Sequence, residues 1–131
     1  MSLMAKVLIV DDEEPIVALM KVVLERCGHT IISAANGQEA LQVLGVNPPN
    51  PAADLPDVVI LDVMMPVMDG YTAAIAMRNA EHTARLPILV VTAKGDMRRL
   101  FEALPAVAGF FDKPFDPKDL RDAIANALKS K

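Results

Sequence analysis

The stretch Val58-Val59-Ile60-Leu61-Asp62 joins four apolar residues directly to a carboxylate, and this arrangement decides the fold. A short apolar run that ends at a polar residue is typical of a strand buried on both faces, as in a parallel sheet covered by helices. Similar stretches occur at residues 7–12 (VLIVDD) and 109–114 (GFFDKP). The sequence therefore predicts three buried strands that each carry charged residues at the carboxyl end.

The composition indicates one globular domain. The chain has 131 residues, of which 53% are hydrophobic, and this is enough for a single core. The net charge of −4 and the scattered basic residues predict no direct contact with nucleic acid. Cys27 is the only cysteine, and no segment resembles a signal peptide or a membrane span, so we expect a cytoplasmic protein without a disulfide. We expect residues 1–4 to be an N-terminal extension or a remnant of cloning, and residues 5–131 to form the domain.

Strand and helix signals alternate along the chain. Apolar runs predict strands over residues 5–10, 30–33, 57–61, 88–92 and 109–111. Helical spacing of apolar residues predicts helices over 15–27, 38–44, 71–80 and 96–104, and a last helix from Pro117 with Asp116 as its N-cap. This alternation predicts an α/β fold, a doubly wound (βα)5 sandwich with a five-stranded parallel sheet.

One segment interrupts the pattern. Residues 46–56 contain four prolines, which cannot continue the preceding helix, so we expect a loop there. The loop precedes the third strand and should therefore lie at the amino ends of the strands. We expect it to be remote from Asp62.

The polar residues at the carboxyl ends of the strands predict a binding site, because ligands of open α/β sheets bind at this edge. In the flavodoxin-like strand order 2-1-3-4-5, the first and third strands are neighbours, and Asp11 and Asp12 then lie about 5 Å from Asp62. Two carboxylates at that distance repel each other by about 3 kcal/mol at an effective dielectric constant near 20. Lys113, reaching over Thr92, and a bound Mg²⁺ could each relieve this repulsion. Such a site suits the formation of an aspartyl phosphate.

At this point the residues resemble a known family, the receiver domain of two-component response regulators. Leu61-Asp62-Val63-Met64-Met65-Pro66 with Asp69-Gly70 is similar to the phosphorylation-site motif of that family. The acidic pair Asp11-Asp12, Thr92-Ala93 and Lys113-Pro114 follow in the order of the family, and the resemblance extends from Ala5 to about Lys129.

The resemblance implies a role for each site residue. Asp62 would be the phosphoacceptor, and Mg²⁺ (or Mn²⁺) would bind Asp12, Asp62 and the backbone carbonyl of Met64 directly, and Asp11 through water. Lys113 would pair with the phosphoryl group, Thr92 would turn its hydroxyl toward the group, and Ala93 would leave room for it. Met64 and Lys94 would flank the phosphoryl group. Phe110 would be the switch aromatic, which turns inward when Thr92 moves. The family also implies a cis peptide bond between Lys113 and Pro114.

The implied function is that of a phosphorylation-controlled signalling switch. The chain would be no enzyme in the usual sense, although it would have intrinsic autophosphorylation and autodephosphorylation chemistry. The donor would be a phosphohistidine on a sensor histidine kinase or a phosphotransfer protein, and the signal would pass to a downstream output domain or protein. No membrane partner is expected, and a homodimer is compatible with the family.

Three alternatives remain open at this stage. A receiver could serve as a constitutive docking module that never cycles its phosphate. A haloacid-dehalogenase-like phosphohydrolase also forms an aspartyl phosphate, but its Asp-x-Asp motif follows the first strand, where this chain has Asp11-Asp12-Glu13. A flavin carrier of the same architecture would have a Ser/Thr/Gly-rich phosphate loop in place of these acids.

Two features depart from the family pattern or lie outside the motifs. The segment from Thr92 to Lys113 is one residue short of the usual spacing, and Pro105 stands at the end of the fourth helix. The interface that receivers commonly use therefore cannot be assumed for this chain. Among the other titratable residues, His29 and His82 are expected at the surface, and Cys27 on the apolar side of its helix.

Overall fold

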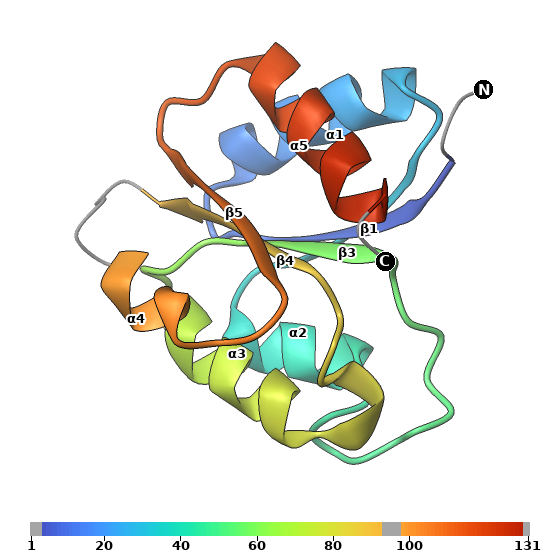
Figure 1. Ribbon diagram of the computed structural model, residues 1–131, viewed down its shortest axis with the longest axis vertical. Coiled ribbons are helices and arrows are strands. Elements are labelled where there is room, and N and C mark those ends of the chain that lie inside the picture. The colour runs from blue at the N-terminus through green and yellow to red at the C-terminus, as the bar shows by residue number, and fades with distance from the viewer. Residues whose placement is uncertain (1–3, 93–97, 130–131) are drawn as a thin grey trace.

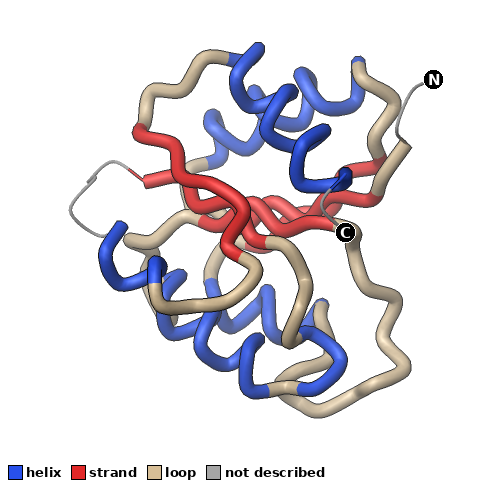
Figure 2. Tube along the Cα trace, in the orientation of Figure 1, coloured by secondary structure: helices blue, strands red, loops and turns tan. Residues whose placement is uncertain are grey.

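A five-stranded parallel sheet forms the centre of the molecule (Figures 1 and 2). In this computed structural model, residues 4–92 and 98–129 are described, Arg98 by its backbone alone. The strands are β1 (Lys6–Val10), β2 (Thr30–Ala34), β3 (Val58–Leu61), β4 (Ile88–Thr92) and β5 (Val107–Asp112). Their order is β2-β1-β3-β4-β5, which confirms the predicted flavodoxin-like topology.

Helices cover both faces of the sheet (Figure 1). One face carries α1 (Glu14–Arg26) and α5 (Pro117–Lys129), and the other carries α2 (Gly37–Val43), α3 (Gly70–Asn79) and α4 (Arg98–Glu102). Alternate residues of each central strand enter the two cores, so that Val59 and Leu61 pack under α2 and α3 while Val58 and Ile60 pack under α1 and α5. Burial on both faces explains why these strands have no polar alternation.

Most element boundaries agree with those predicted from the sequence. The fifth strand begins at Val107, two residues earlier than expected, after Ala106 in the left-handed region (φ 61°). The fourth helix ends at Glu102, before the expected Leu104, and its expected start at Asp96 lies outside the described residues. A short 3₁₀ helix, Glu81–Thr83, was not predicted. Asp116 caps α5 as expected, since its side chain accepts the N–H of Lys118 at 2.8 Å.

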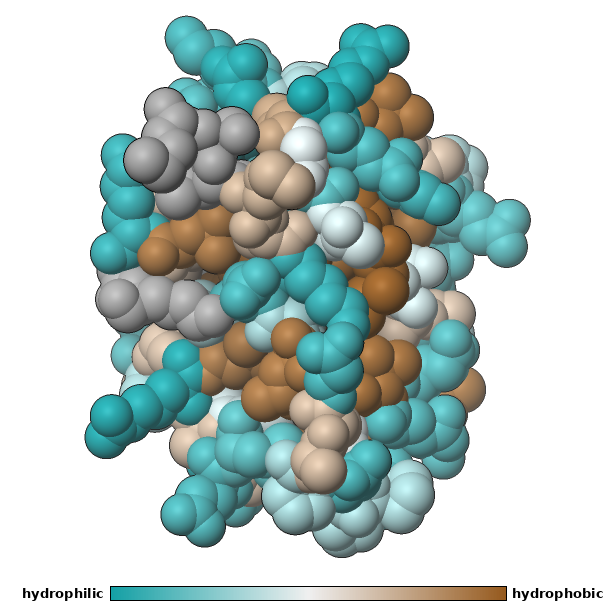
Figure 3. Space-filling model, turned by 90° about the vertical axis from the view of Figure 1, so that its right-hand side faces the viewer, coloured by the Kyte–Doolittle hydropathy of each residue, from teal (hydrophilic) through white to brown (hydrophobic). Residues whose placement is uncertain are grey.

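The proline-rich loop lies at the amino ends of the strands, as predicted. The Lys6 ammonium at the start of β1 pairs with Asp54 at 2.7 Å, and Asp57 accepts the backbone N–H of Lys6 at 2.9 Å. Figure 3 views this side of the molecule, where several hydrophobic patches lie between hydrophilic side chains. The loop therefore lies at the amino ends of the strands, whereas Asp62 lies at the opposite, carboxyl end of β3.

His29 corrects one expectation. It follows Gly28, which lies two residues beyond the end of α1 and has a φ of 93°, but His29 is only 8% exposed. The ring atom Nδ1 accepts the N–H of Ala5 at 3.1 Å, which ties the turn after α1 to the start of β1. Its place directly after the helix-capping Gly28 had suggested a surface position, whereas the Ala5 N–H before β1 requires an acceptor, and the buried His29 ring supplies it.

Within the described part of the chain, none of the helices combines the length and hydrophobicity that are needed to cross a membrane.

Candidate functional site

Asp62 is held at the carboxyl end of β3 by backbone contacts on two sides. Its N–H donates to the carbonyl of Val10 on β1 at 2.9 Å, and its residue exposure is 4%. On the other side Gly70 packs against Asp62 so closely that a Cβ at Gly70 would collide with the Asp62 carbonyl oxygen. Gly70 also donates its N–H to Val63 at 2.8 Å. The start of α3 and the end of β3 therefore form one closely packed unit.

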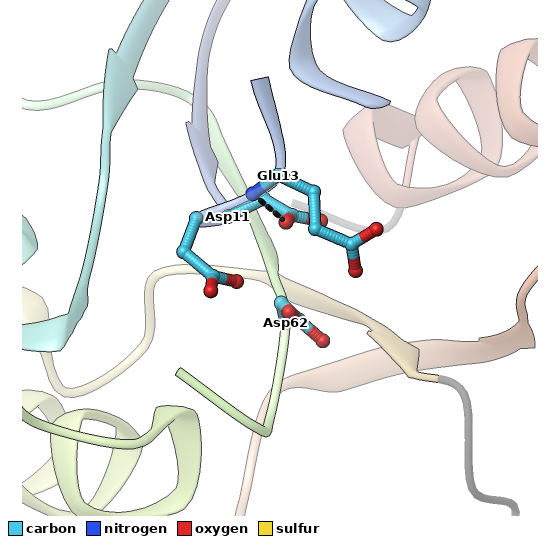
Figure 4. Close-up of side chains that lie close together, drawn as sticks. Asp11, Glu13 and Asp62 are labelled. Carbon is cyan, nitrogen blue, oxygen red and sulfur yellow. Dashed lines mark hydrogen bonds between the residues drawn. The ribbon is translucent and has the colours of Figure 1, made fainter. Parts of the chain in front are cut away.

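Four carboxylates gather at this edge of the sheet. Each of Asp11, Asp12, Glu13 and Asp62 offers one oxygen such that all four oxygens lie within 4.8 Å of one another. Figure 4 shows Asp11 and Glu13, from the segment after β1, beside Asp62. The Asp11 side chain turns back and accepts the N–H of Glu13 at 2.9 Å, which fixes the path of this segment. The predicted proximity of the acidic pair to Asp62 is thus present.

Glu13 was missed as a site residue. The sequence interpretation assigned the two aspartates to the site and gave Glu13 no role there. Its position directly after Asp12, and before the helix begins at Glu14, was the available signal, because a residue in the connecting segment can turn toward the strand ends.

Lys113 lies among these acids. Its Nζ is 2.8 Å from Asp11 Oδ2, 3.0 Å from Glu13 Oε1 and 3.4 Å from Asp62 Oδ2, and its side chain is 10% exposed. Burial of the ammonium lowers the pKa of Lys113, but the contacts with Asp11 and Glu13 and the charge of Asp62 outweigh burial, so the pKa lies above its ordinary value. Lys113 is therefore a permanent cation at this site.

The carboxyl group of Asp62 has the opposite balance. Burial and the neighbouring charge of Asp11 raise the pKa of Asp62 from 3.8 to about 6, and Lys113 and the hydrogen bond from Val63 offset only part of this. Oδ1 accepts the N–H of Val63 at 2.9 Å, whereas Oδ2 has Lys113 at 3.4 Å, beyond the usual length of a charged hydrogen bond. One oxygen of Asp62 is thus fixed and the other is loosely held.

Two further predicted residues lie on neighbouring strands. Thr92 is the last residue of β4 and is 2% exposed. Its backbone carbonyl accepts a hydrogen bond from the N–H of Lys113 at 2.9 Å. Phe110 on β5 lies opposite Val90 and packs into the core under α3 and α4. The peptide bond between Lys113 and Pro114 is cis, as the resemblance implied. Ala93 and Lys94 lie outside the described residues, and the Met64 carbonyl stays a predicted ligand.

The acidic cluster suits a divalent cation. Asp11 Oδ2 is buried, and its neighbour among the described residues is the Lys113 ammonium at 2.8 Å, so a cation already lies at the cluster. Asp12 and Glu13 are exposed, so solvent reaches the cluster. Carboxylate oxygens together with water are the ligand set that Mg²⁺ prefers.

Comparison with known proteins agrees with this geometry. The sequence model of the family described as response regulator receiver domain matches residues 7–125. This chain belongs to the response regulator receiver domain family. The receiver is 37% identical over 125 residues to a probable transcriptional regulator, ycf27, of Guillardia theta, covering 95% of this chain and 45% of that protein. It is 34% identical to the alkaline phosphatase synthesis transcriptional regulatory protein PhoP of Bacillus subtilis, covering 95% of this chain and 48% of that protein.

A solved structure gives the same result. The receiver is similar to the chemotaxis response regulator CheY4 of Vibrio cholerae, with a TM-score of 0.83 and 33% identity, over 96% of this chain and all of that one (100%). The chain spans about half the length of the curated relatives that it matches. Receiver domains are regulatory modules of two-component systems that bind Mg²⁺ at an acidic pocket, and this receiver has a cluster of four acidic residues at the edge of its sheet.

Proposed function

We propose that this receiver is a phosphoacceptor switch, in which a phosphoryl group passes from a phosphohistidine to Asp62. The observation that carries the proposal is the state of the Asp62 carboxylate, which is buried, has a pKa of about 6 and lies 3.4 Å from a permanent cation, Lys113. With this pKa the carboxylate is largely ionised at neutral pH, as a nucleophile must be, and Lys113 can balance the charge that arrives.

The transfer exchanges one bond to phosphorus for another. Asp62 Oδ2 forms the new P–O bond while the N–P bond of the donor breaks, and the imidazole leaves with the electron pair of that bond. Val63 holds Oδ1 at 2.9 Å, so that Oδ2 is the oxygen available for attack. Lys113 then shifts its contact from the carboxylates to the phosphoryl oxygens. The products are the aspartyl phosphate and a free histidine.

The acidic cluster would hold Mg²⁺ or Mn²⁺. Asp12, Asp62 and the Met64 carbonyl would bind the ion directly and Asp11 through water, and Glu13 adds a carboxylate within the same 4.8 Å cluster. The bound ion supplies positive charge for the phosphoryl oxygens. With the ion held by these acids, Lys113 would be free to pair with the phosphoryl group.

The proposed response to phosphorylation runs through Thr92 and Phe110. Thr92 would turn its hydroxyl toward the phosphoryl group, and the ring of Phe110 would move inward into the space that Thr92 vacates. We propose that this changes a partner-binding face, that a sensor histidine kinase or phosphotransfer protein is the donor, and that a downstream output domain or protein reads the change. This signalling would take place in the cytoplasm, and a homodimer is one form that the phosphorylated receiver could take.

Phosphorylation with a small donor tests the proposal. The purified receiver is incubated with acetyl phosphate and Mg²⁺, and the intact mass of the protein is measured. Wild type should gain one phosphoryl group and Asp62→Asn should gain none, because the substitution removes the nucleophile. Asp69→Asn is the matched control, since Asp69 lies in the same loop and caps α3 by accepting the N–H of Thr72 at 2.7 Å, which asparagine can also do. Equal modification of wild type and Asp62→Asn would overturn the assignment.

The alternatives are distinguished by this experiment and by one further assay. No modification of wild type would favour a constitutive docking module. Rapid release of phosphate from a generic phosphate ester would favour a phosphohydrolase. Loss of modification when EDTA is added would support the need for a divalent cation.

A further inference from the structure

Three aromatic rings from three different elements form a continuous cluster beside the site. The ring of Phe101 on α4 lies 5.4 Å from that of Tyr71 on α3, at an interplanar angle of 83°, and 6.2 Å from that of Phe110 on β5, at 74°. Both contacts have the edge-to-face geometry that aromatic pairs prefer. Phe101 is therefore the link between the switch aromatic and the first turn of α3.

The Tyr71 end of this cluster is fixed relative to the phosphorylation site. Tyr71 directly follows Gly70, which packs against the backbone of Asp62 and donates its N–H to Val63 at 2.8 Å. The ring of Tyr71 is partly buried and borders a pocket of about 400 Å³ that also involves Met64 and Leu100. A rearrangement of the other two rings would therefore change the surroundings of Tyr71 and leave its backbone in place.

The Phe101 ring is also the main anchor of α4. The described part of this helix is five residues long, too short to be stable without tertiary contacts. Phe101 is fully buried (0% exposed), whereas its neighbours Leu100 and Glu102 are exposed. Figure 1 shows α4 beside α3 and next to β5, as the two ring contacts require. The position of α4 thus depends on how Phe101 fits between the other two rings.

We propose that Phe101 is a positioning residue of the switch, which couples the orientation of Phe110 to α4 and to Tyr71. The inference rests on the proposed phosphoacceptor function and extends it to residues outside the motif set. When Phe110 changes its orientation, the fully buried Phe101 ring must move as well, because closely packed side chains cannot shift independently of one another. Phe101 then shifts with α4, and the contact with Tyr71 changes.

The chain carries a natural reporter for this coupling. Tyr71 is the only tyrosine and the chain has no tryptophan, so the intrinsic fluorescence of the protein comes from one ring of the cluster. The emission of wild type, Phe101→Leu and Phe111→Leu is recorded before and after phosphorylation with acetyl phosphate and Mg²⁺, and intact mass gives the extent of phosphorylation. Phe111→Leu is the matched control, because Phe111 is the next residue of β5 and packs on the opposite face of the sheet.

Wild type and Phe111→Leu should show the same change in Tyr71 emission. Phe101→Leu should be phosphorylated to the same extent as wild type. Its change in Tyr71 emission should be at most about one third of the wild-type change, because the coupling through the Phe101 ring is lost. If Phe101→Leu does not fold, Phe101→Met serves in its place, because the unbranched methionine side chain adapts to an irregular space and also lacks an aromatic ring. A full emission change in the Phe101 variant, an equal loss in Phe111→Leu, or no change in phosphorylated wild type would each overturn the inference. Failure of the proposed function is distinguished by the mass, since wild type would then remain unmodified.

Discussion

At the scale of single residues, Asp62 is a carboxylate whose ionised form the fold disfavours. Its pKa of about 6 against an ordinary 3.8 means that the folded protein binds a proton there more tightly than the unfolded chain does. Proton binding by Asp62 therefore stabilises the folded protein. This contribution is fully present below pH 3.8 and is lost as the pH rises through about 6. The ionised nucleophile is thus kept at neutral pH at a cost in stability.

Asp62→Asn should therefore stabilise the metal-free protein at pH 7. The gain should be about 2 kcal/mol, somewhat less than the full pKa difference implies because solvent screens part of it. At pH 4 the gain should nearly vanish, since Asp62 is then protonated in the folded state. Urea unfolding of both proteins at the two pH values measures this. An equal difference at both pH values would show that the effect is unrelated to ionisation.

His29 should give stability the opposite pH dependence. Burial lowers the pKa of His29 below 6.5, with Asp57 opposing, so the folded state favours the neutral ring, whose Nδ1 accepts the N–H of Ala5. The unfolded chain takes up a proton first as the pH falls below 6.5, and stability should fall with it. His29→Asn keeps a hydrogen-bond acceptor near the position of Nδ1 but cannot titrate, so its stability should not show the fall below pH 6.5 that His29 causes. Thermal unfolding from pH 7.5 to 5 in an Asp62→Asn background separates the two groups, and an unchanged pH profile in His29→Asn would contradict the assignment.

At the scale of elements, α3 organises more of the molecule than its length suggests. Its first turn carries Gly70 and Tyr71 beside the site. Near its other end the Arg78 guanidinium donates to three backbone carbonyls, those of Pro105 at 2.6 Å, Thr83 at 3.0 Å and Leu86 at 2.8 Å. Arg78 thereby joins α3 to the 3₁₀ helix, to the turn before β4 and to the turn between α4 and β5.

Arg78→Ala should destabilise the protein by about 2 to 4 kcal/mol, because three carbonyls would lose a charged donor. Burial lowers the pKa of Arg78, yet an arginine stays charged throughout the physiological range. Arg78→Lys should recover only part of the loss, since a lysine cannot present the planar fork. The urea midpoint measures both variants. Arg121, exposed and 3.6 Å from Asp122, is the control, and Arg121→Ala should cost less than about 0.5 kcal/mol.

At the scale of the whole molecule, the strand order creates the site. Asp11 follows β1, Asp62 follows β3 and Lys113 follows β5, so their meeting depends on the β2-β1-β3-β4-β5 arrangement and on the reach of the lysine side chain. A ligand that binds this assembled edge binds the folded state alone and stabilises the entire domain.

Mg²⁺ should therefore raise the melting temperature of the receiver. The four acids are close together only in the folded chain, and a ligand at 100 times its dissociation constant adds about 2.7 kcal/mol. Thermal unfolding over a series of Mg²⁺ concentrations at constant ionic strength measures this, and EDTA should abolish the shift. Asp12→Asn should reduce the shift strongly, whereas Asp122→Asn, on α5, should keep it. A shift of equal size in Asp12→Asn would place the ion elsewhere.

The sequence predicted the sheet, its strand order and the proximity of Asp11, Asp12 and Lys113 to Asp62. The apolar runs at 7–10, 58–61 and 88–91 are local signals of buried strands, and the polar residues that directly follow them, Asp11, Asp62 and Thr92, mark the carboxyl edge. The cis peptide before Pro114 and the position of the proline-rich loop were also predicted, the first from the family resemblance and the second from its place before the third strand.

What the sequence by itself determined is the alternation of elements and the residue types at each strand end, because both depend on neighbours in the chain. Only the tertiary structure decided that Glu13 joins the acids, that Lys113 is closer to Asp11 than to Asp62, that His29 is buried, and that Phe101 lies between Tyr71 and Phe110. Each of these features depends on contacts between elements that are far apart in the sequence. They are set by strand register, by the twist of the sheet and by the packing of helices on it, which no local pattern encodes.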